Sequence, residues 1–337
     1  MKAAIIGVGR MGRRHIQVVR ELGLELAGVC DQSSESLETA GQEHAIPPEL
    51  LFRDSSDLLK QTRPECVIVA TTAPMHCYYT CLAAEAGAKY ILCEKPMGVS
   101  LDECDRMLNA CKQNDVRLAI NHQMRFMEQY TKAKKIIQSD AFGGLSSVTV
   151  VAGNMGMAMN GTHYFEMFRY MADEAPEVVT AWFSTEEVPN PRGPQFQDRA
   201  GSVRVTSASG KRFYMDISAD QGHGLMAIYS GPHGRLVVDE LLGTMHLSAR
   251  EDQYRNLPTT RYGMPSLDQS LSCKPADAVG PSRSVLEALL NEDNPPSGED
   301  GRMAVAALVA AYVSHENGHR PVRPNGDLPL NRIFPWA

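Results

Sequence analysis

The sequence lacks an apolar run long enough to cross a membrane and lacks an excess of basic residues. A membrane-spanning helix needs about 20 consecutive apolar residues, and the apolar runs of this chain are far shorter. The chain carries 33 Lys and Arg against 40 Asp and Glu, a formal net charge of −7. Binding to nucleic-acid phosphates needs a basic surface instead. We therefore expect neither a membrane nor a nucleic-acid partner.

The cysteines lack the CxxC spacing that is typical of zinc and redox sites. Most of them lie in or beside apolar segments, as buried structural thiols do. Cys77 and Cys81 are spaced as helix neighbours and would bind a metal only with further ligands, so we expect no metal site. The apolar run after Met1 is too short for a signal peptide. Together these features predict a cytoplasmic protein with reduced thiols.

The chain has 337 residues, which is long enough for two domains. Residues 1–122 alternate apolar segments with helical patterns, which predicts an α/β domain with a doubly wound parallel sheet. After residue 122, strands follow one another with short turns, which predicts a second, α+β domain over residues 123–337 with a large, open, mostly antiparallel sheet. The predicted strands of that domain are 145–153, 177–184, 200–207, 211–219, 225–231 and 234–239. Residues 250–281, rich in Pro, Ser, Asp and Tyr, are predicted to form a long loop.

A glycine-rich turn follows the first apolar segment, residues 3–6, in the order Gly7-Val8-Gly9-Arg10-Met11-Gly12. A helical pattern and a second strand ending at Asp31 complete the fingerprint of a Rossmann dinucleotide-binding domain. Gly7 permits the tight turn, Gly9 leaves room for a pyrophosphate at the helix start, and Gly12 allows close packing of helix and strand. The Asp31 carboxylate would bind ribose hydroxyls and repel a 2′-phosphate, which favours NAD over NADP. The cofactor contacts expected here are Gly7, Gly9, Arg10, Met11, Gly12 and Asp31.

Later strands of the same predicted sheet end in further candidate residues. The carboxyl ends of parallel strands meet at one edge, so these residues should lie beside the glycine turn and contact the cofactor. They are Thr71, Thr72, Pro74, His76, Glu94 and Lys95. Two interpretations of His76 stay open, a substrate-side residue or a solvated histidine at a helix start. Glu94 and Lys95 are either a surface ion pair or part of the chemistry.

The helix predicted over residues 160–171 carries His163 in its first turn and Glu166 one turn later. The helix dipole disfavours an imidazolium at that end, which would keep His163 neutral and able to accept a proton. Glu166 would then orient His163 or balance its charge. The alternatives are a packed structural histidine and a metal-binding pair. For the latter we find no third and fourth ligand at helical spacing.

Together these motifs resemble the glucose–fructose oxidoreductase, inositol dehydrogenase and rhizopine-catabolism family (Gfo/Idh/MocA). The resemblance covers nearly the whole chain. It rests on Gly7-x-Gly9-x-x-Gly12, Ala70-Thr71-Thr72-Ala73-Pro74-x-His76, Glu94-Lys95-Pro96, Arg125-Phe126, His163-x-x-Glu166 and the closing Pro329-Leu330-x-Arg332-x-Phe334-Pro335. It implies a Rossmann domain, a second domain with a large open sheet, a tightly held nicotinamide and a polyol, sugar or sugar-nucleotide substrate.

One departure from the family pattern concerns the residue one turn before the catalytic histidine. Family dehydrogenases often carry an aspartate there, whereas this chain has Met159, with Asn160 beside it. Neither side chain accepts a proton at neutral pH. The resemblance also implies that Lys95 and Pro96 shape the nicotinamide pocket. The base must then be His163 or Lys95.

The sequence therefore predicts an NAD-dependent dehydrogenase that moves a hydride between the nicotinamide and a secondary alcohol or ketone. Lys95 would polarise the reacting oxygen and His163 would act as the acid or base. Two alternatives stay open: an enzyme that uses bound NAD for transient oxidation during glycoside cleavage or epimerisation, and a non-enzymatic sensor of NAD and a sugar. The expected substrate contacts are Lys95, Asn121, His122, Arg125, Asn160 and His163. The open sheet predicts a homodimer or homotetramer.

Overall fold

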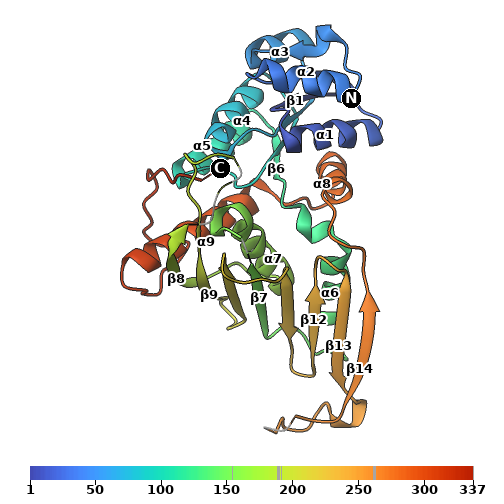
Figure 1. Cartoon of the computed structure of the whole chain (residues 1–337), viewed down its shortest axis with the longest axis vertical. Helices are drawn as coiled ribbons and strands as arrows, with labels where there is room; N and C mark the ends of the chain where they lie inside the picture. The colour runs from blue at the N-terminus through green and yellow to red at the C-terminus, as the bar shows by residue number, and fades with distance from the viewer. Residues whose placement is uncertain (154, 188–189, 191, 261–262, 337) are drawn as a thin grey trace. The chain divides into compact units, whose positions relative to one another are not determined.

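The computed structural model describes residues 1–153, 155–187, 190, 192–260 and 263–336 (Figure 1). The chain forms two compact units, and each contains more than one stretch of the sequence. Unit 1 contains residues 1–123, 277–305 and 329–337, and unit 2 contains residues 124–276 and 306–328. The expected division into the consecutive ranges 1–122 and 123–337 differs from this, because two late segments pack with unit 1.

Unit 1 is built on a parallel sheet with the strand order β3-β2-β1-β4-β5-β6. This is the order of a Rossmann fold, as predicted. The strands are β1 (Lys2–Ile6), β2 (Glu25–Cys30), β3 (Leu51–Phe52), β4 (Cys66–Val69), β5 (Tyr90–Cys93) and β6 (Arg117–Ile120). Every residue of the central strand β4 is buried, because helices cover both faces of such a sheet.

The helices of unit 1 form two groups around this sheet (Figure 1). α1 packs against α8, and α4 contacts both α3 and α5. α8 also contacts β5 and β6, which explains why residues 277–305 belong to unit 1 although they lie far along the chain. The helices are α1 (Arg10–Glu21), α2 (Ser34–Glu43), α3 (Ser55–Thr62), α4 (His76–Glu85), α5 (Leu101–Gln113), α8 (Val279–Asn291) and the first part of α9 (Gly298–Glu316).

The start of α5 contains a capping box, for which the spacing of Ser100 and Glu103 is typical. The Glu103 N–H donates to Ser100 Oγ at 3.1 Å, and Glu103 Oε2 accepts the N–H of Val99 at 2.9 Å. The return bond therefore goes to the residue before the cap rather than to the cap itself. The Phe334 N–H donates to the Val99 carbonyl at 2.9 Å, which fastens the closing segment of the chain to unit 1.

Unit 2 is built on a second sheet with the strand order β14-β13-β12-β11-β7-β10-β9-β8. β7 and β10 are parallel and the other neighbouring strands are antiparallel, which confirms the prediction of a mostly antiparallel sheet. The strands are β7 (Ser147–Gly153), β8 (Val178–Glu187), β9 (Arg199–Thr206), β10 (Arg212–Ser218), β11 (Met226–Ser230), β12 (Gly234–Asp239), β13 (Thr244–Arg250) and β14 (Ser266–Ser272).

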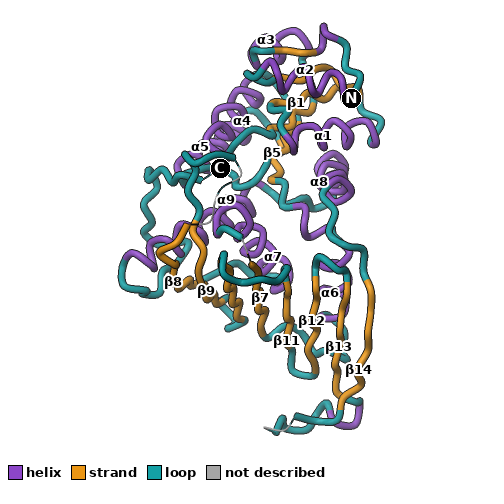
Figure 2. Tube along the Cα trace, in the orientation of Figure 1, coloured by secondary structure: helices purple, strands orange, loops and turns teal. Residues whose placement is uncertain are grey.

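The prediction of a long loop over residues 250–281 is wrong in part. Residues 266–272 form β14, which pairs with β13 along its whole length. All residues of β14 are exposed, and polar residues dominate the strand, so its sequence lacks the usual hydrophobic alternation. Figure 2 shows it as a long strand at one edge of the sheet, held by backbone hydrogen bonds to β13. These residues form a strand because they pair with β13, and not because of a local hydrophobic pattern.

Helices α6 (Glu128–Ile137) and α7 (Thr162–Ala172) and the later part of α9 pack against the sheet of unit 2. Phe168 of α7 stacks on Phe213 of β10 with ring centroids 5.6 Å apart. Alternate strand residues are buried, as in β7, where Val148 and Val150 face the core. Short helical turns are η1 (Pro48–Leu50), η2 (Ala73–Met75), η3 (Gln123–Phe126), η4 (Met157–Gly161, one π turn) and η5 (Asp252–Tyr254).

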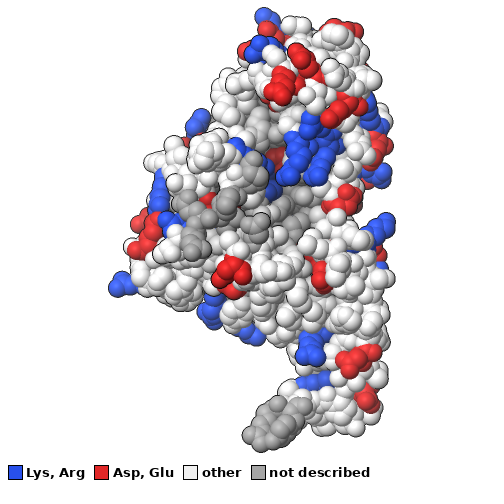
Figure 3. Space-filling model, viewed as in Figure 1, with Lys and Arg blue, Asp and Glu red and all other residues white. Residues whose placement is uncertain are grey.

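Charged side chains of both signs lie on the surface, and the cysteine side chains are mostly buried. The face shown in Figure 3 carries acidic and basic side chains on both units. All eight cysteines are free, and Cys81 is the one that is not fully buried. No helix in the described ranges is long and apolar enough to span a membrane.

A buried carboxyl group lies in the core of unit 2, between the sheet and two helices. Glu240 follows β12 and is only 4% exposed. The Tyr130 hydroxyl of α6 donates to its Oε1 at 2.5 Å, and the Tyr164 hydroxyl of α7 donates to its Oε2 at 3.4 Å. Burial raises the pKa of Glu240 to about 8, against the smaller opposing effect of these hydrogen bonds.

This burial predicts that the stability of the protein falls as the pH rises. Between about pH 5 and about pH 8, Glu240 holds a proton in the folded protein and loses it on unfolding, so the free energy of unfolding decreases with pH. The side chain in Glu240→Gln cannot ionise. The variant's free energy of unfolding should therefore decrease across that window by at least about 1 kcal/mol less than that of the parent. Urea unfolding at several pH values measures this. Glu38→Gln, exposed on α2, is the control, and parallel profiles for Glu240→Gln and the parent would contradict the prediction.

Candidate active site

The glycine turn after β1 leaves open space at one of its three glycines. At Gly7, which has a φ of +94°, an added Cβ would lie 2.7 Å from the carbonyl carbon of Ala70. At Gly12 it would lie 1.9 Å from the carbonyl oxygen of Gly7. At Gly9 it would meet nothing within 4 Å. Gly7 and Gly12 therefore serve close backbone packing, whereas Gly9 borders the free space that a pyrophosphate requires.

The start of α1 and the end of β2 supply polar groups beside this space. Gly9 caps α1 without a side-chain hydrogen bond, and the first turn contains no acidic residue, so its N–H groups favour an anion. Asp31 Oδ2 accepts the Val8 N–H at 2.8 Å, and Oδ1 accepts the Ser33 N–H at 2.9 Å. Each oxygen keeps a lone pair for a ribose hydroxyl. These residues fit the dinucleotide NAD.

The remaining loop residues of the predicted cofactor site lie at the carboxyl ends of β1 and β4. Arg10 and Pro74 are exposed, and Met11, Thr71 and Thr72 are partly exposed. The Ala70 N–H donates to the Ile6 carbonyl at 2.8 Å, so the two loops begin at the same edge of the sheet. The structure brings these residues together as the parallel-sheet argument predicts, and their contacts with a cofactor stay predictions.

His76 links two loops at this edge. It is buried, its Nδ1 lies 2.8 Å from the carbonyl oxygen of Pro96, and its Nε2 lies 3.2 Å from that of Thr71. A carbonyl oxygen only accepts and a neutral imidazole has one N–H, so the ring donates to one of these two carbonyls, depending on its tautomer. The interpretation of His76 as a solvated histidine is therefore wrong. Its position indicates that it holds the loops after β4 and β5 together.

The Glu94 carboxylate is buried in a polar network behind Lys95. Its Oε1 lies 2.8 Å from His15 Nε2 and accepts the side-chain amide of Asn121 at 2.8 Å. The same amide nitrogen lies 3.1 Å from Ser282 Oγ of α8. Burial opposes ionisation, but the hydrogen bonds and charge of His15, the Asn121 amide and the charge of Lys95 outweigh it and lower the pKa of Glu94 to about 2. The interpretation of Glu94 as half of a surface ion pair is wrong.

This network explains how the Lys95 loop is held. The Lys95 N–H donates to Glu94 Oε2 at 3.4 Å, and the Lys95–Pro96 peptide is cis. His15 and Ser282 were not foreseen, because nothing in a single sequence connects α1 or α8 with residue 94. Asn121 was predicted to contact the substrate. The structure uses its amide nitrogen to hold Glu94, and a substrate contact stays a prediction.

In unit 2, His163 lies at the second position of α7 and is 7% exposed. One π turn, η4, runs directly into this helix and contains Asn160, which is partly exposed. The buried Asp198 carboxylate accepts the N–H groups of Ala158 and Met159 in this turn, at 2.7 Å and 2.8 Å. No pattern in the sequence predicts this contact, because Asp198 lies far along the chain from the helix, directly before β9.

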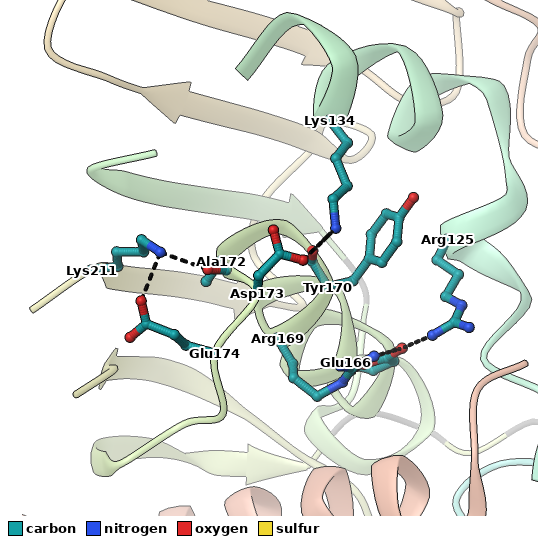
Figure 4. A network of polar contacts seen from close by, with 9 residues as sticks. All are labelled: Arg125, Lys134, Glu166, Arg169, Tyr170, Ala172, Asp173, Glu174 and Lys211. Carbon is teal, nitrogen blue, oxygen red and sulfur yellow. Dashed lines mark hydrogen bonds and ion pairs between the residues drawn. The ribbon is translucent and has the colours of Figure 1, made fainter. Parts of the chain in front are cut away.

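Glu166 binds two arginines, as Figure 4 shows. Its Oε1 accepts from Arg125 at 3.3 Å, and its carboxylate pairs with Arg169 through contacts of 2.7 Å and 3.1 Å. The Arg125 guanidinium also lies over the Tyr170 ring, 5.7 Å from its centroid. The sequence paired Glu166 with His163 and missed the arginines. Arg125 and His122, both predicted substrate contacts, are buried.

Metal binding has no geometric support in the part of the chain that the structure describes. Within those ranges, no three His, Cys, Asp or Glu side chains are grouped so as to hold a metal ion.

Comparison with known proteins gives these features a family. Residues 1–122 match the family model GFO_IDH_MocA, described as an oxidoreductase family with an NAD-binding Rossmann fold. The D-apiose dehydrogenase of Paraburkholderia graminis is 26% identical, with 94% of this chain and 88% of that protein covered. Residues 1–122 therefore belong to the Gfo/Idh/MocA family of oxidoreductases, and the match to D-apiose dehydrogenase extends the similarity over nearly the whole chain.

Two further comparisons differ in extent. The inositol 2-dehydrogenase of Salmonella typhimurium is 30% identical, but the match covers only 42% of this chain and 43% of that protein. An Agrobacterium radiobacter oxidoreductase, crystallised with NAD+, L-tartaric acid and magnesium, has the same fold. Its TM-score is 0.80 at 18% identity, with 96% of this chain and 98% of that chain covered. The protein is thus an NAD-binding oxidoreductase of the Gfo/Idh/MocA type.

The open space at Gly9 leads to a prediction for cofactor binding. A methyl group there fits the free protein but occupies the room for the pyrophosphate, so Gly9→Ala should fold normally and bind NAD at least about 10-fold more weakly. Isothermal titration calorimetry and thermal melting measure the two effects. Gly222→Ala is the matched control, because its added Cβ also meets nothing within 4 Å. Unchanged NAD affinity in Gly9→Ala would show that the pyrophosphate does not bind here.

Proposed function

We propose that this oxidoreductase is an NAD-dependent dehydrogenase acting on a secondary alcohol or ketone of a polyol, sugar or sugar nucleotide. The observation that carries the proposal is the open glycine turn at an uncapped helix start beside the fixed Asp31 carboxylate. When bound, NAD supplies the acceptor for a hydride. The names of the relatives, D-apiose dehydrogenase and inositol 2-dehydrogenase, support CH–OH chemistry on small polyhydroxylated substrates.

His163 is proposed as the acid or base. In the oxidation, the substrate C–H bond breaks with its electron pair leaving as hydride, and the hydroxyl proton passes to the neutral imidazole. The alcohol carbon would become a carbonyl carbon, with bound NAD as the acceptor of the hydride. An imidazole suits this step because the ordinary pKa of this group lies near neutral pH. In the reduction, the imidazolium returns the proton to the oxygen.

Lys95 is proposed to stabilise the oxygen as it loses its proton. An ammonium group placed at a developing alkoxide lowers the energy of the transition state more than that of the ground state. The Glu94 network holds the backbone of this loop from one side, and His76 holds it from the other through the Pro96 carbonyl. Two buried side chains therefore fix the position from which the Lys95 ammonium acts.

His122, Arg125 and Asn160 are proposed to bind further substrate groups. The guanidinium of Arg125 is oriented by Glu166 and by the Tyr170 ring, so little side-chain entropy is lost on binding.

Trp182, 48% exposed, and Tyr214, 36% exposed, support the proposal that the open face of the unit 2 sheet forms a homodimer or homotetramer.

The decisive test is a substrate panel. The protein is incubated with NAD and with inositols, pentoses, hexoses and nucleotide sugars, and NADH is followed by its absorbance. Steady accumulation of NADH with at least one compound supports a dehydrogenase. Substrate conversion without net NADH would instead indicate transient oxidation during cleavage or epimerisation. No conversion across the panel would favour a sensor.

A variant tests the acid–base role of His163. His163→Ala removes the proton acceptor and should lower kcat/KM by about 100-fold to 10,000-fold, with NAD affinity unchanged. Initial rates with the substrate from the panel, and calorimetric titration with NAD, measure these two quantities. His246→Ala, an exposed position on β13, should retain full activity. Near-normal turnover by His163→Ala would rule out its role.

The charge of Lys95 is tested in the same assay. Lys95→Met keeps much of the side-chain volume but removes the ammonium, and kcat should fall by about 100-fold or more. Lys89→Met, exposed just before β5, provides the control. If Lys95→Met retained the parent kcat, alkoxide stabilisation would have to come from another group.

A further inference from the structure

We propose that Asp198 is a positioning residue that sets the proton affinity of His163 through the start of α7. This inference rests on the proposed function, in which His163 exchanges a proton with the substrate. Asp198 comes from the segment directly before β9, and its carboxylate lies at the start of the helical segment that carries His163.

Asp198 is fixed by one hydrogen bond to each carboxylate oxygen. It is 1% exposed, Oδ1 accepts the N–H of Ala158, and Oδ2 accepts that of Met159. These are adjacent N–H groups at the beginning of the π turn. The carboxylate therefore lies across the amino end of the helical segment and satisfies donors that have no partner within the helix.

The space for this carboxylate is built into the chain. At Gly156 an added Cβ would lie 2.1 Å from Asp198 Oδ2, so a glycine is needed beside it. The Gly156 carbonyl accepts the N–H groups of Asn160 and Gly161 at 3.1 Å and 3.3 Å, and the Thr162 hydroxyl donates to the Ala158 carbonyl at 3.1 Å. These bonds make the π turn and the first turn of α7 one continuous element from the carboxylate to His163.

The position of His163 on this element couples it to the carboxylate. Helical side chains lean toward the amino end, so the imidazole lies over the turn that contains Met159. A bare helix start carries about half a positive charge and would disfavour an imidazolium. The negative charge of Asp198 at the same N–H groups opposes this effect and favours the imidazolium. The imidazolium that forms during alcohol oxidation is thereby stabilised.

Several other charged groups around α7 pair with one another in the described part of the chain. Glu166 forms ion pairs with Arg125 and Arg169, and Lys134 of α6 pairs with Asp173 after α7 (Figure 4). The second carboxyl group packed against α7, Glu240, lies among Tyr130, Tyr164 and Tyr229, and burial favours its protonated form. Asp198 is the carboxylate bound to the backbone one turn before His163.

The test compares pH profiles of kcat/KM for alcohol oxidation by the full-length enzyme. Asp198→Asn keeps the size of the side chain and one of its two backbone hydrogen bonds but removes the charge. We expect the acidic limb of the profile to move to lower pH by about 1 unit, because the imidazolium loses a stabilising charge. The plateau should fall by about 10-fold, because the base is weaker. NAD affinity should not change.

The matched control is Asp54→Asn, another carboxylate that caps a helix. Asp54 accepts the N–H groups of Ser56 and Asp57 at the start of α3, at 2.8 Å and 3.0 Å. Its replacement should leave the pH profile in place. Lower activity of Asp198→Asn with an unmoved acidic limb would mean a merely structural role and would overturn the proposal.

Two further measurements distinguish failure of the Asp198 proposal from failure of the proposed function. Full activity of His163→Ala would refute the role of His163 in the proposed function, whatever Asp198→Asn does. If Asp198→Asn does not fold, the parent enzyme is titrated by NMR, with the imidazole signal of His163 assigned by its absence in His163→Gln. His163 should titrate at a higher pH than the exposed His246, and a lower midpoint would overturn the proposal.

Discussion

The buried Glu94 carboxylate is the group on which the proposed catalytic edge of unit 1 depends. A charge removed from water is stable only when hydrogen bonds and opposite charge compensate its desolvation. Here the compensation comes from His15 of α1 and Asn121 after β6, and Asn121 in turn contacts Ser282 of α8. One carboxylate therefore fixes elements that are distant in sequence against the loop of Lys95. The return of residues 277–305 to unit 1 supplies part of this support.

Unit 2 uses carboxylates in a similar way around α7. Asp198 binds the backbone at its start, Glu166 binds arginines along its length, and Glu240 accepts a hydroxyl from its Tyr164. Asp198 and Glu240 come from other elements, and Glu166 of α7 reaches out to another element through Arg125. These contacts hold the helix on several sides. A proton-transfer group gains from such rigidity, because its distance to the reacting oxygen decides the rate.

The departure from the Gfo/Idh/MocA pattern at Met159 has a physical counterpart in the structure. Where the family often places an aspartate one turn before the histidine, this chain has an apolar side chain whose backbone N–H binds Asp198. A carboxylate thus lies at the same helix start but comes from the segment before β9. The chemistry that the helix start permits depends on the charge there, whichever element provides it.

The sequence by itself determined the Rossmann sheet, the glycine turn, the NAD preference and the nature of the second sheet, because each depends on local pattern: apolar periodicity, glycine spacing and the placement of Asp31. Only the tertiary structure decided that β14 is a strand, that His76 is buried, and that His15, Ser282 and Asp198 support the candidate residues. Those features arise from contacts between elements far apart in the chain. A backbone hydrogen bond or a buried ion pair between such elements leaves no periodic signal in a single sequence.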